Sequence, residues 1–375
     1  MRIALLRQRY NPYGGAERFI ERAVAALGMD VALTVYAREW SGSGTGGAAV
    51  VRCDPFYVGR LWRDWSYARA ACRAAAADAP DLVQSHERIA CCDIYRAGDG
   101  VHAQWLENRG ATLGRLGRLG VALNPYHRYV LAAERRLFAS PRLRAVICNS
   151  RMVREEIRRH FGVAEAKLHV IYNGVDLEAF HPRLREAHRH AMRVRLGIPE
   201  AALVHLFVGS GYERKGVFPL LRAFAAAPQR DAFLLVVGKD KAESRAVAFA
   251  GSLGIAGRVH FAGAQKEVAP WYGAADSFVL PTLYDPFPNA ALEAMACGLP
   301  VITTRQCGAA ELIDAGVEGY VVASDGGPGL AEALGRLDPQ SARRMGERAR
   351  NRAEGYGLEP MRRRMIALYR TLVPA

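Results

Sequence analysis

The chain has 375 residues, half of them apolar, and its Lys and Arg residues exceed its Asp and Glu residues by 14. This length exceeds one ordinary core, so we expect two domains. No run approaches the ~18 apolar residues of a membrane span, which argues against an integral membrane protein. The opening MRIALLRQRY has too few apolar residues for a signal peptide and is predicted to be a first strand. The basic balance favours anionic partners, such as nucleotide diphosphates, phosphorylated glycolipids, acidic membranes or nucleic acid.

The first domain begins with a predicted strand at residues 3–6, a loop at 8–15 and a helix from 16 to about 27. The loop contains Gly14 and Gly15 directly before the helix. Two glycines at a helix start let the backbone approach an anion closely. Glycine is common in such loops, so the pair is equally compatible with an ordinary strand-to-helix connection.

Further strands are predicted at 31–36 and 81–85, a strand and loop at 93–100, and a helix at 62–77. The loop ends in GDGVHAQW, which contains Asp99 and His102. Carboxyl ends of parallel strands line ligand sites in open α/β sheets. Both side chains are candidates to face an acceptor molecule, and a purely structural role for each stays open.

Residues 107–144 form a basic insert with eight Arg and two Glu, interleaved with Leu, Tyr and Phe. Arginines beside apolar and aromatic side chains fit an anionic membrane surface. The alternative is a helix-loop-helix that packs on the domain through its leucines.

The second domain is predicted to start with a strand at 202–208, after a charged linker or peripheral helix at 183–197. The next segment, GSGYERKGV, has Arg214 where a dinucleotide fingerprint needs Gly, and Val217 where a P-loop needs Lys. Arg214 and Lys215 remain as adjacent cations in a Gly-bounded loop at the end of a strand. We expect them to neutralise a diphosphate.

A strand–loop–helix–strand unit is predicted at residues 277–304. Asp285 lies in its loop, Asn289 is predicted to cap the helix, and Glu293 lies in the second helical turn. The first backbone N–H groups of such a helix, at Asn289, Ala290 and Ala291, suit a phosphate. Carboxylates near a phosphate site indicate a ligand that also has hydroxyls, as a nucleotide sugar does.

The stretch DPFPNAALEAMACGLPV resembles the E-x7-E signature of retaining glycosyltransferases of family 4, with Asp285 in place of the first Glu. NPYGGAER, NGVD and ERKGV match other motifs of this family, and the basic insert resembles the heptose glucosyltransferases of the lipopolysaccharide core. The resemblance implies the GT-B fold, an α/β architecture in which two Rossmann-like domains face each other across a cleft. The expected domains are residues 1–180 on the acceptor side, 181–357 for the nucleotide sugar, and a helix at 358–375 that crosses back to the first domain.

The resemblance also implies the site. Candidate catalytic residues are Arg214, Lys215, Asp285, Asp99 and His102. Donor-binding candidates are Gly14, Gly15, Asn289, Ala290, Ala291, Glu293 and Gly263. The donor would be a UDP-sugar, with UDP-glucose expected, and the acceptor a glycolipid, without a metal ion, another cofactor or a nucleic acid partner. The enzyme would work on the cytoplasmic face of the inner membrane.

The seven cysteines include the neighbours Cys91 and Cys92 and contain no C-x-x-C pair. This pattern predicts reduced thiols in an intracellular protein and no zinc site. Two other functions stay open. One is a UDP-sugar epimerase on the same fold, which would act without an acceptor. The other is a non-enzymatic basic protein that binds membranes or nucleic acid.

Overall fold

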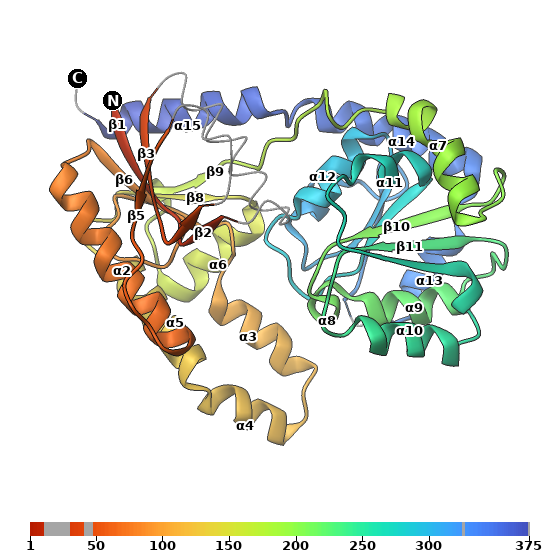
Figure 1. The fold of residues 1–375 in the computed structure, drawn as a ribbon, viewed down its shortest axis with the longest axis horizontal. Helices are drawn as coiled ribbons and strands as arrows, with labels where there is room; N and C mark the ends of the chain where they lie inside the picture. The colour runs from red at the N-terminus through yellow and green to blue at the C-terminus, as the bar shows by residue number, and fades with distance from the viewer. Residues whose placement is uncertain (11–30, 41–47, 325–326, 374–375) are drawn as a thin grey trace. The chain divides into compact units, whose positions relative to one another are not determined.

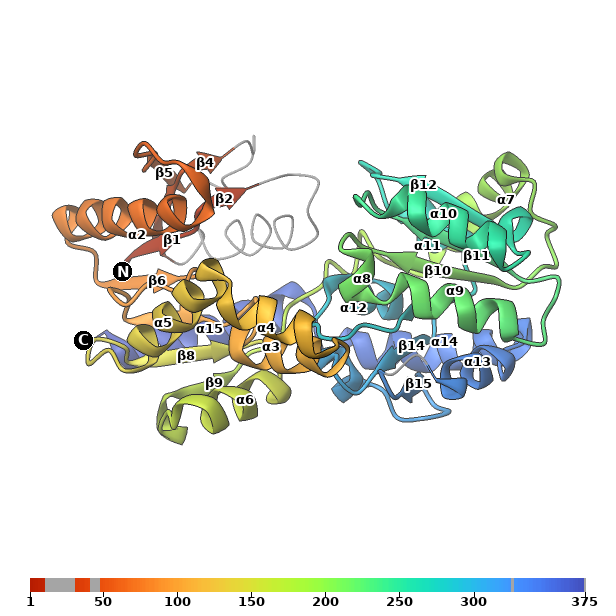
Figure 2. The same ribbon diagram turned by 90° about the horizontal axis from the view of Figure 1, so that it is seen from below.

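The computed structural model describes residues 1–10, 31–40, 48–324 and 327–373. The chain forms two compact units, which Figure 1 shows in one view and Figure 2 in a second. Unit 1 contains Met1–Gly174 and Leu358–Ala375, and unit 2 contains Val175–Gly357. Along the described ranges, no helix is both long and apolar enough to cross a bilayer.

Unit 1 is built on a seven-stranded sheet in the order β5-β3-β1-β6-β7-β8-β9, with every neighbouring pair parallel. Its strands are β1 (Arg2–Leu6), β3 (Ala32–Ala37), β5 (Ala49–Arg52), β6 (Leu82–Ser85), β7 (Ile94–Arg96), β8 (Ala145–Cys148) and β9 (Leu168–Val170). A two-stranded sheet pairs β2 (Arg9–Tyr10) with β4 (Glu39–Trp40). Strands such as β8 are apolar at every position because parallel sheets are covered on both faces.

Alternate residues of these strands lie in two cores, one on each face of the sheet. The helices of unit 1 are α2 (Gly59–Asp78), α3 (His102–Ala111), α4 (Arg115–Leu123), α5 (Pro125–Phe138), α6 (Arg151–Phe161), α15 (Leu358–Leu372) and the 3₁₀ turn η1 (Glu165–Lys167). Met365 and Tyr369 of α15 pack in one core with Ile3 and Leu33 of β1 and β3. Helix α15 therefore completes the core of a sheet whose strands all lie in the first half of the chain.

Unit 2 contains a six-stranded parallel sheet in the order β12-β11-β10-β13-β14-β15. Its strands are β10 (Val204–Val208), β11 (Phe233–Val237), β12 (Val259–Gly263), β13 (Ser277–Leu280), β14 (Val301–Thr304) and β15 (Gly319–Val322). Its helices are α7 (Arg183–Leu196), α8 (Tyr212–Lys215), α9 (Val217–Ala226), α10 (Glu243–Ser252), α11 (Ala269–Ala274), α12 (Asn289–Ala296), α13 (Pro328–Gly335) and α14 (Pro339–Glu354), with 3₁₀ turns η2 (Ala256–Arg258) and η3 (Gly308–Leu312). The neighbours β10 and β13 are far apart in sequence, so the loops that follow them emerge side by side at one edge.

Helix α7 occupies the segment that was predicted to be a linker or peripheral helix. Three of its arginines, Arg185, Arg189 and Arg193, form ion pairs of 3.0, 2.8 and 2.7 Å with the buried Asp276 at the start of β13. Burial alone would raise the pKa of Asp276, but the arginines hold it below its ordinary value. The ion pairs with the buried Asp276 carboxylate therefore hold α7 against the sheet of unit 2.

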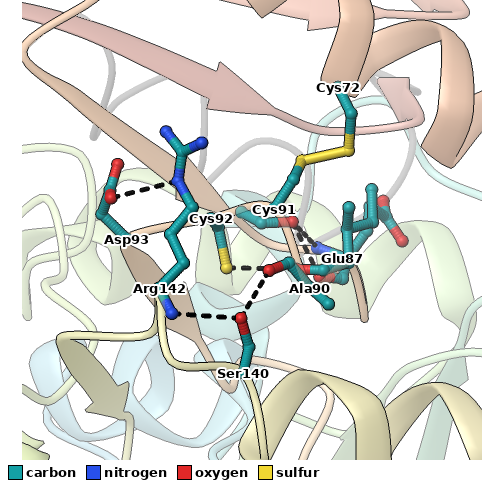
Figure 3. Close-up of a disulfide and its surroundings, with 10 residues drawn as sticks. Cys72, Glu87, Ala90, Cys91, Cys92, Asp93, Ser140 and Arg142 are labelled. Carbon is teal, nitrogen blue, oxygen red and sulfur yellow. Dashed lines mark hydrogen bonds and ion pairs between the residues drawn. A yellow bond between two sulfur atoms is a disulfide. The ribbon is translucent and has the colours of Figure 1, made fainter. Parts of the chain in front are cut away.

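A disulfide joins Cys72 of α2 to Cys91, which follows β6 (Figure 3). The prediction that all seven cysteines are reduced is wrong for this pair. The fold brings their Cα atoms to 6.2 Å, a proximity that a sequence separation of 19 does not reveal. Among the described residues, Cys53, Cys92, Cys148, Cys297 and Cys307 are free and buried.

Candidate functional site

The turn after β10 presents the two predicted cations. Gly209, Gly211 and Gly216 have positive φ angles, and the single helical turn α8 lies between the last two. A Cβ atom at Gly209 would lie 2.7 Å from Cδ of Lys215, and one at Gly216 would lie 2.0 Å from the carbonyl oxygen of Pro281. The glycines thus let the Lys215 side chain cross the backbone and let the turn abut the end of β13.

Two residues that the sequence analysis did not single out hold this turn from the side of β11. The Asp240 carboxylate accepts hydrogen bonds from the N–H groups of Gly211 at 2.7 Å and Tyr212 at 3.3 Å. The Tyr212 hydroxyl donates to the carbonyl of Gly238 at 2.6 Å. Asp240 lies three residues after the end of β11, so the parallel sheet brings it to the same carboxyl edge as the turn after β10.

The loop after β13 holds the turn from the other side. The carbonyl oxygen of Arg214 accepts hydrogen bonds from the N–H of Leu283 at 2.8 Å and from the hydroxyl of Thr282 at 3.0 Å. The Arg214 guanidinium donates to the carbonyl of Tyr284 at 2.9 Å. The cationic turn and the acidic loop are therefore one hydrogen-bonded structure at the carboxyl edge of the sheet.

Asp285 meets both cations in this structure. Its carboxylate lies 3.3 Å from Nζ of Lys215 and 3.4 Å from Nη1 of Arg214, with the carboxylate almost completely buried. Its backbone is fixed as well, since its N–H donates to Gln306 and its carbonyl accepts from the N–H of Gly308. Within this group of three side chains, one carboxylate is paired with two cations.

Helix α12 begins at Asn289, and the prediction that Asn289 caps it is wrong. Pro288 is the N-cap residue, in extended conformation, and its side chain makes no capping hydrogen bond. The N–H of Ala291 donates to the carbonyl of Pro288 at 3.1 Å, so it is engaged within the first turn. Asn289 and Ala290 form the rest of that turn, directly after the Asp285 loop.

The other two donor-site candidates of unit 2 lie on α12 and β12. The Glu293 carboxylate accepts a hydrogen bond of 2.9 Å from the hydroxyl of Tyr272, which also contacts the carbonyl of Ala290 at 3.2 Å. Gly263 ends β12, and its carbonyl accepts from the N–H of Gly238 at 2.8 Å. Tyr272 is a further residue that sequence reasoning missed, because it lies on α11.

In unit 1, Asp99 and His102 lie close together after β7. Asp99 is half exposed and lies 4.0 Å from the guanidinium of Arg7, while His102 is the first residue of α3. The buried Glu134 of α5 accepts from the N–H of His102 at 2.7 Å and forms a 2.9 Å ion pair with Arg88. Gly14 and Gly15 lie outside the described residues.

Rings surround the His102 side chain. Its Nε2 lies 3.1 Å from Nδ1 of His127, and its ring stacks on Trp105 with centroids 5.5 Å apart. Burial, and then the charges of Arg88 and His127, lower the pKa of His102 to about 3. The imidazole is therefore neutral at pH 7 and can exchange a hydrogen bond with a hydroxyl. The part of the chain that the structure describes contains no cluster of three or more metal-binding side chains.

Comparisons with known proteins agree with this architecture. A family model for glycosyl transferases group 1 matches residues 202–338, and one for glycosyltransferase family 4 matches residues 13–179. The D-inositol 3-phosphate glycosyltransferase 1 of Catenulispora acidiphila is 30% identical over 61% of this chain and 57% of its own length, so the chain spans little more than half of that relative. The lipopolysaccharide glucosyltransferase WaaG of Escherichia coli is 27% identical over 96% of both chains.

Solved structures give the same fold. A crystal structure of WaaG is similar with a TM-score of 0.84 and 24% identity, covering 98% of this chain and 99% of that one. Anabaena HepE, solved in complex with UDP-glucose, is similar with a TM-score of 0.76 and 21% identity, covering 99% and 100%. With two parallel sheets, both halves matched by glycosyltransferase models and a full-length likeness to WaaG, the chain belongs to the family-4 glycosyltransferases and has the GT-B fold.

Proposed function

We propose that the chain transfers glucose from UDP-glucose to a sugar hydroxyl of a lipopolysaccharide-core or related glycolipid, with retention of anomeric configuration. The observation that carries this proposal is the convergence of Arg214 and Lys215 on Asp285 at the carboxyl edge of the unit 2 sheet. The name of the E. coli relative and the UDP-glucose bound to HepE support the choice of acceptor and donor.

The chemistry follows from charge. When the bond between the sugar and the diphosphate breaks, negative charge grows on the leaving phosphate while the sugar becomes oxocarbenium-like. Arg214, Lys215 and the first turn of α12 would stabilise that charge, because preorganised cations and N–H groups need no rearrangement as it develops. Asp285 would keep the cations oriented and accept hydrogen bonds from the sugar hydroxyls. Glu293, oriented by Tyr272, would accept those of the ribose.

The acceptor hydroxyl would meet residues of unit 1, which we assign as the acceptor domain, with unit 2 as the donor domain. Asp99 and His102 are the proposed contacts of the acceptor hydroxyl. Gly14 and Gly15 are proposed to contact the phosphates of the donor. We further propose that the leaving phosphate itself takes the acceptor proton, since the His102 imidazole pairs with the His127 imidazole rather than with a carboxylate. No divalent metal is needed in this scheme, because Arg and Lys supply the positive charge.

The basic insert at 107–144 would hold the enzyme on the cytoplasmic face of the inner membrane. Leu116, Leu119 and Leu123 of α4 are all exposed and recur at spacings of three and four residues, so they share one helix face. Arginines beside such a face suit anionic headgroups. This contact would bring the active site to an acceptor that is itself a lipid.

The test is transfer from UDP-glucose to a purified heptose-containing core glycolipid, with released UDP and the anomeric configuration of the product as readouts. We expect turnover that persists in EDTA and a thermal shift with UDP-sugars. A ligand at 100 times its Kd stabilises a protein by about 2.7 kcal/mol. Conversion of the UDP-sugar without acceptor would favour an epimerase. Failure to bind any UDP-, GDP- or ADP-sugar would refute the proposal.

A further inference from the structure

A second surface of unit 1 combines exposed rings with arginines, at the loop before α2 and along its first half. We call it the α2 surface and define it by Phe56, Val58, Leu61, Trp62 and Trp65. Phe56 is 76% exposed, Val58 66%, and the two tryptophans 42% and 45%. Leu61, Trp62 and Trp65 recur at spacings of three and four residues, so their side chains share one face of α2, and Val58 is the N-cap residue of this helix.

The exposure of these rings is fixed by the opposite face of the helix. Tyr67, Ala71 and Ala75 are buried in the core of unit 1, and the Tyr67 hydroxyl donates to the carbonyl of Tyr36 at 2.8 Å. The disulfide at Cys72 fastens the same helix. Since α2 cannot rotate without opening this core, its aromatic face stays outward. Contiguous exposed apolar side chains of this size mark interaction sites in soluble domains.

Positive charge frames the α2 surface. Residues 52–73 contain five arginines and two aspartates. Both aspartates, Asp54 and Asp64, already form ion pairs with arginines. The guanidinium of Arg69 lies 5.1 Å from the ring centroid of Trp65, so a cation accompanies an exposed ring directly. The surface is therefore complementary to an anionic partner with an apolar interior.

The α2 surface also adjoins the α4 face. The guanidinium of Arg60 lies 5.4 Å from the Tyr126 ring, and the Tyr126 hydroxyl donates to Asp64 at 3.0 Å. Tyr126 belongs to the first turn of α5, which follows α4 after Asn124 alone. The start of α2 thus contacts the chain only three residues beyond Leu123, the last exposed leucine of α4.

We propose that the α2 surface is a second contact of this protein with an anionic lipid bilayer. Phe56, Trp62 and Trp65 would enter the headgroup boundary, where amphipathic rings are favoured, and the arginines would meet lipid phosphates. Two adjoining contacts would bind more tightly than α4 alone and would fix how unit 1 is oriented on the membrane. The inference goes beyond the proposed transfer reaction, because lipid binding at this surface does not depend on which sugar is moved.

The experiment measures cosedimentation of the full chain with vesicles of phosphatidylglycerol and of phosphatidylcholine, without donor or acceptor. We expect binding to phosphatidylglycerol that weakens with salt. The double substitution Trp62→Ser/Trp65→Ser should lower the partition coefficient roughly tenfold or more, because two rings no longer leave water. The control is Val194→Ser/Val247→Ser, which removes exposed apolar side chains from unit 2 and should leave binding unchanged.

Two results would overturn the proposal. One is unchanged vesicle binding by a Trp62→Ser/Trp65→Ser protein whose thermal unfolding matches the wild type. The other is a wild-type dimer in light scattering that this variant abolishes, which would assign the surface to a second copy of the chain. Leu116→Ser/Leu119→Ser separates the α4 contact from the α2 contact. If the wild-type protein binds vesicles but does not transfer the sugar, the proposed reaction is contradicted and the proposed lipid contact is not.

Discussion

The two groups of candidate site residues are held in place by different means. In unit 2, Arg214 and Lys215 lie on a turn whose backbone is bonded to Asp240 on one side and Thr282 and Leu283 on the other. In unit 1, the loop with Asp99 and His102 is held by side chains from other elements. Glu134 accepts from the N–H of His102, the Arg88 guanidinium donates to the carbonyl of Gly100 at 3.1 Å, and the Asn149 amide donates to the carbonyl of Gly98 at 3.2 Å. A turn that is held through its backbone should tolerate the loss of one of its charged side chains. A loop that is held by side chains should be destabilised when the buried Glu134 is removed.

The largest expected effect tests that dependence in unit 1. Glu134→Ala removes the partner of the partly buried Arg88 and the acceptor of the His102 N–H. We expect a loss of about 3–5 kcal/mol in the free energy of unfolding, as for other broken buried pairs. Chemical denaturation measures it, with Glu107→Ala as the control, since Glu107 is an exposed acid of the same insert. A loss below 1 kcal/mol would mean that the loop has other support.

Lys215→Ala tests the opposite expectation in unit 2. Because the turn is held through its backbone, the melting temperature should stay near that of the wild type. Sugar transfer should fall by about 10²–10³ in kcat, as when one preorganised group is removed from a developing charge. The matched control is Lys241→Ala, an exposed lysine on the loop after β11. Near-normal turnover of the Lys215 variant would remove this residue from the mechanism.

The disulfide offers a third comparison, because it lies in unit 1 alone. Cys72→Ser/Cys91→Ser should destabilise unit 1 by about 2–4 kcal/mol, because the unfolded chain gains conformational entropy without the cross-link. Unit 2 should be little affected. Hydrogen exchange resolved by segment can show this asymmetry. Cys297→Ser, in unit 2, keeps the bond and serves as the control. Equal loss of protection in both units would argue that they unfold together.

The smallest effect is a pH dependence from His102. Its pKa in the folded protein is about 3, below the value of about 6.5 for an unperturbed histidine. The unfolded chain therefore binds the proton first, and stability decreases as pH falls from about 6.5 toward 3. His127, also shifted downward by burial, contributes in the same direction. His102→Asn should flatten the melting temperature between pH 7 and 5, whereas the exposed His190→Asn should not.

Features that depend on residues close together in the sequence could be predicted, and contacts between distant segments could not. The segments around Arg214 and Asp285 could be recognised because their functional residues lie within a few positions of one another. The two parallel sheets could be predicted from apolar runs separated by helices. The helix of Glu293 was placed correctly. Its cap was wrong, because Pro288 takes the N-cap position with an extended backbone and moves Asn289 into the helix.

Interactions between distant segments were not predictable. Asp240 and Tyr272 reach the site from neighbouring elements, and Cys72 meets Cys91 only after α2 has packed on its sheet. The segment of α7 was predicted to be a linker or a peripheral helix, and it is a helix. Nothing near it in sequence reveals that its arginines pair with Asp276. In each case the residue type was visible but the partner lay more than 15 residues away.

The place of α15 sets an order for synthesis in the cell. Met365 and Tyr369 fill the core beneath β1 and β3, but a ribosome makes them only after all of unit 2. All of unit 2 has been synthesised once residue 357 has emerged from the ribosome. Unit 1 is translated first, but its core stays incomplete until α15 has been made. A fragment ending at residue 174 would lack that cover, so unit 1 should be produced in isolation only with residues 358–375 joined back to it.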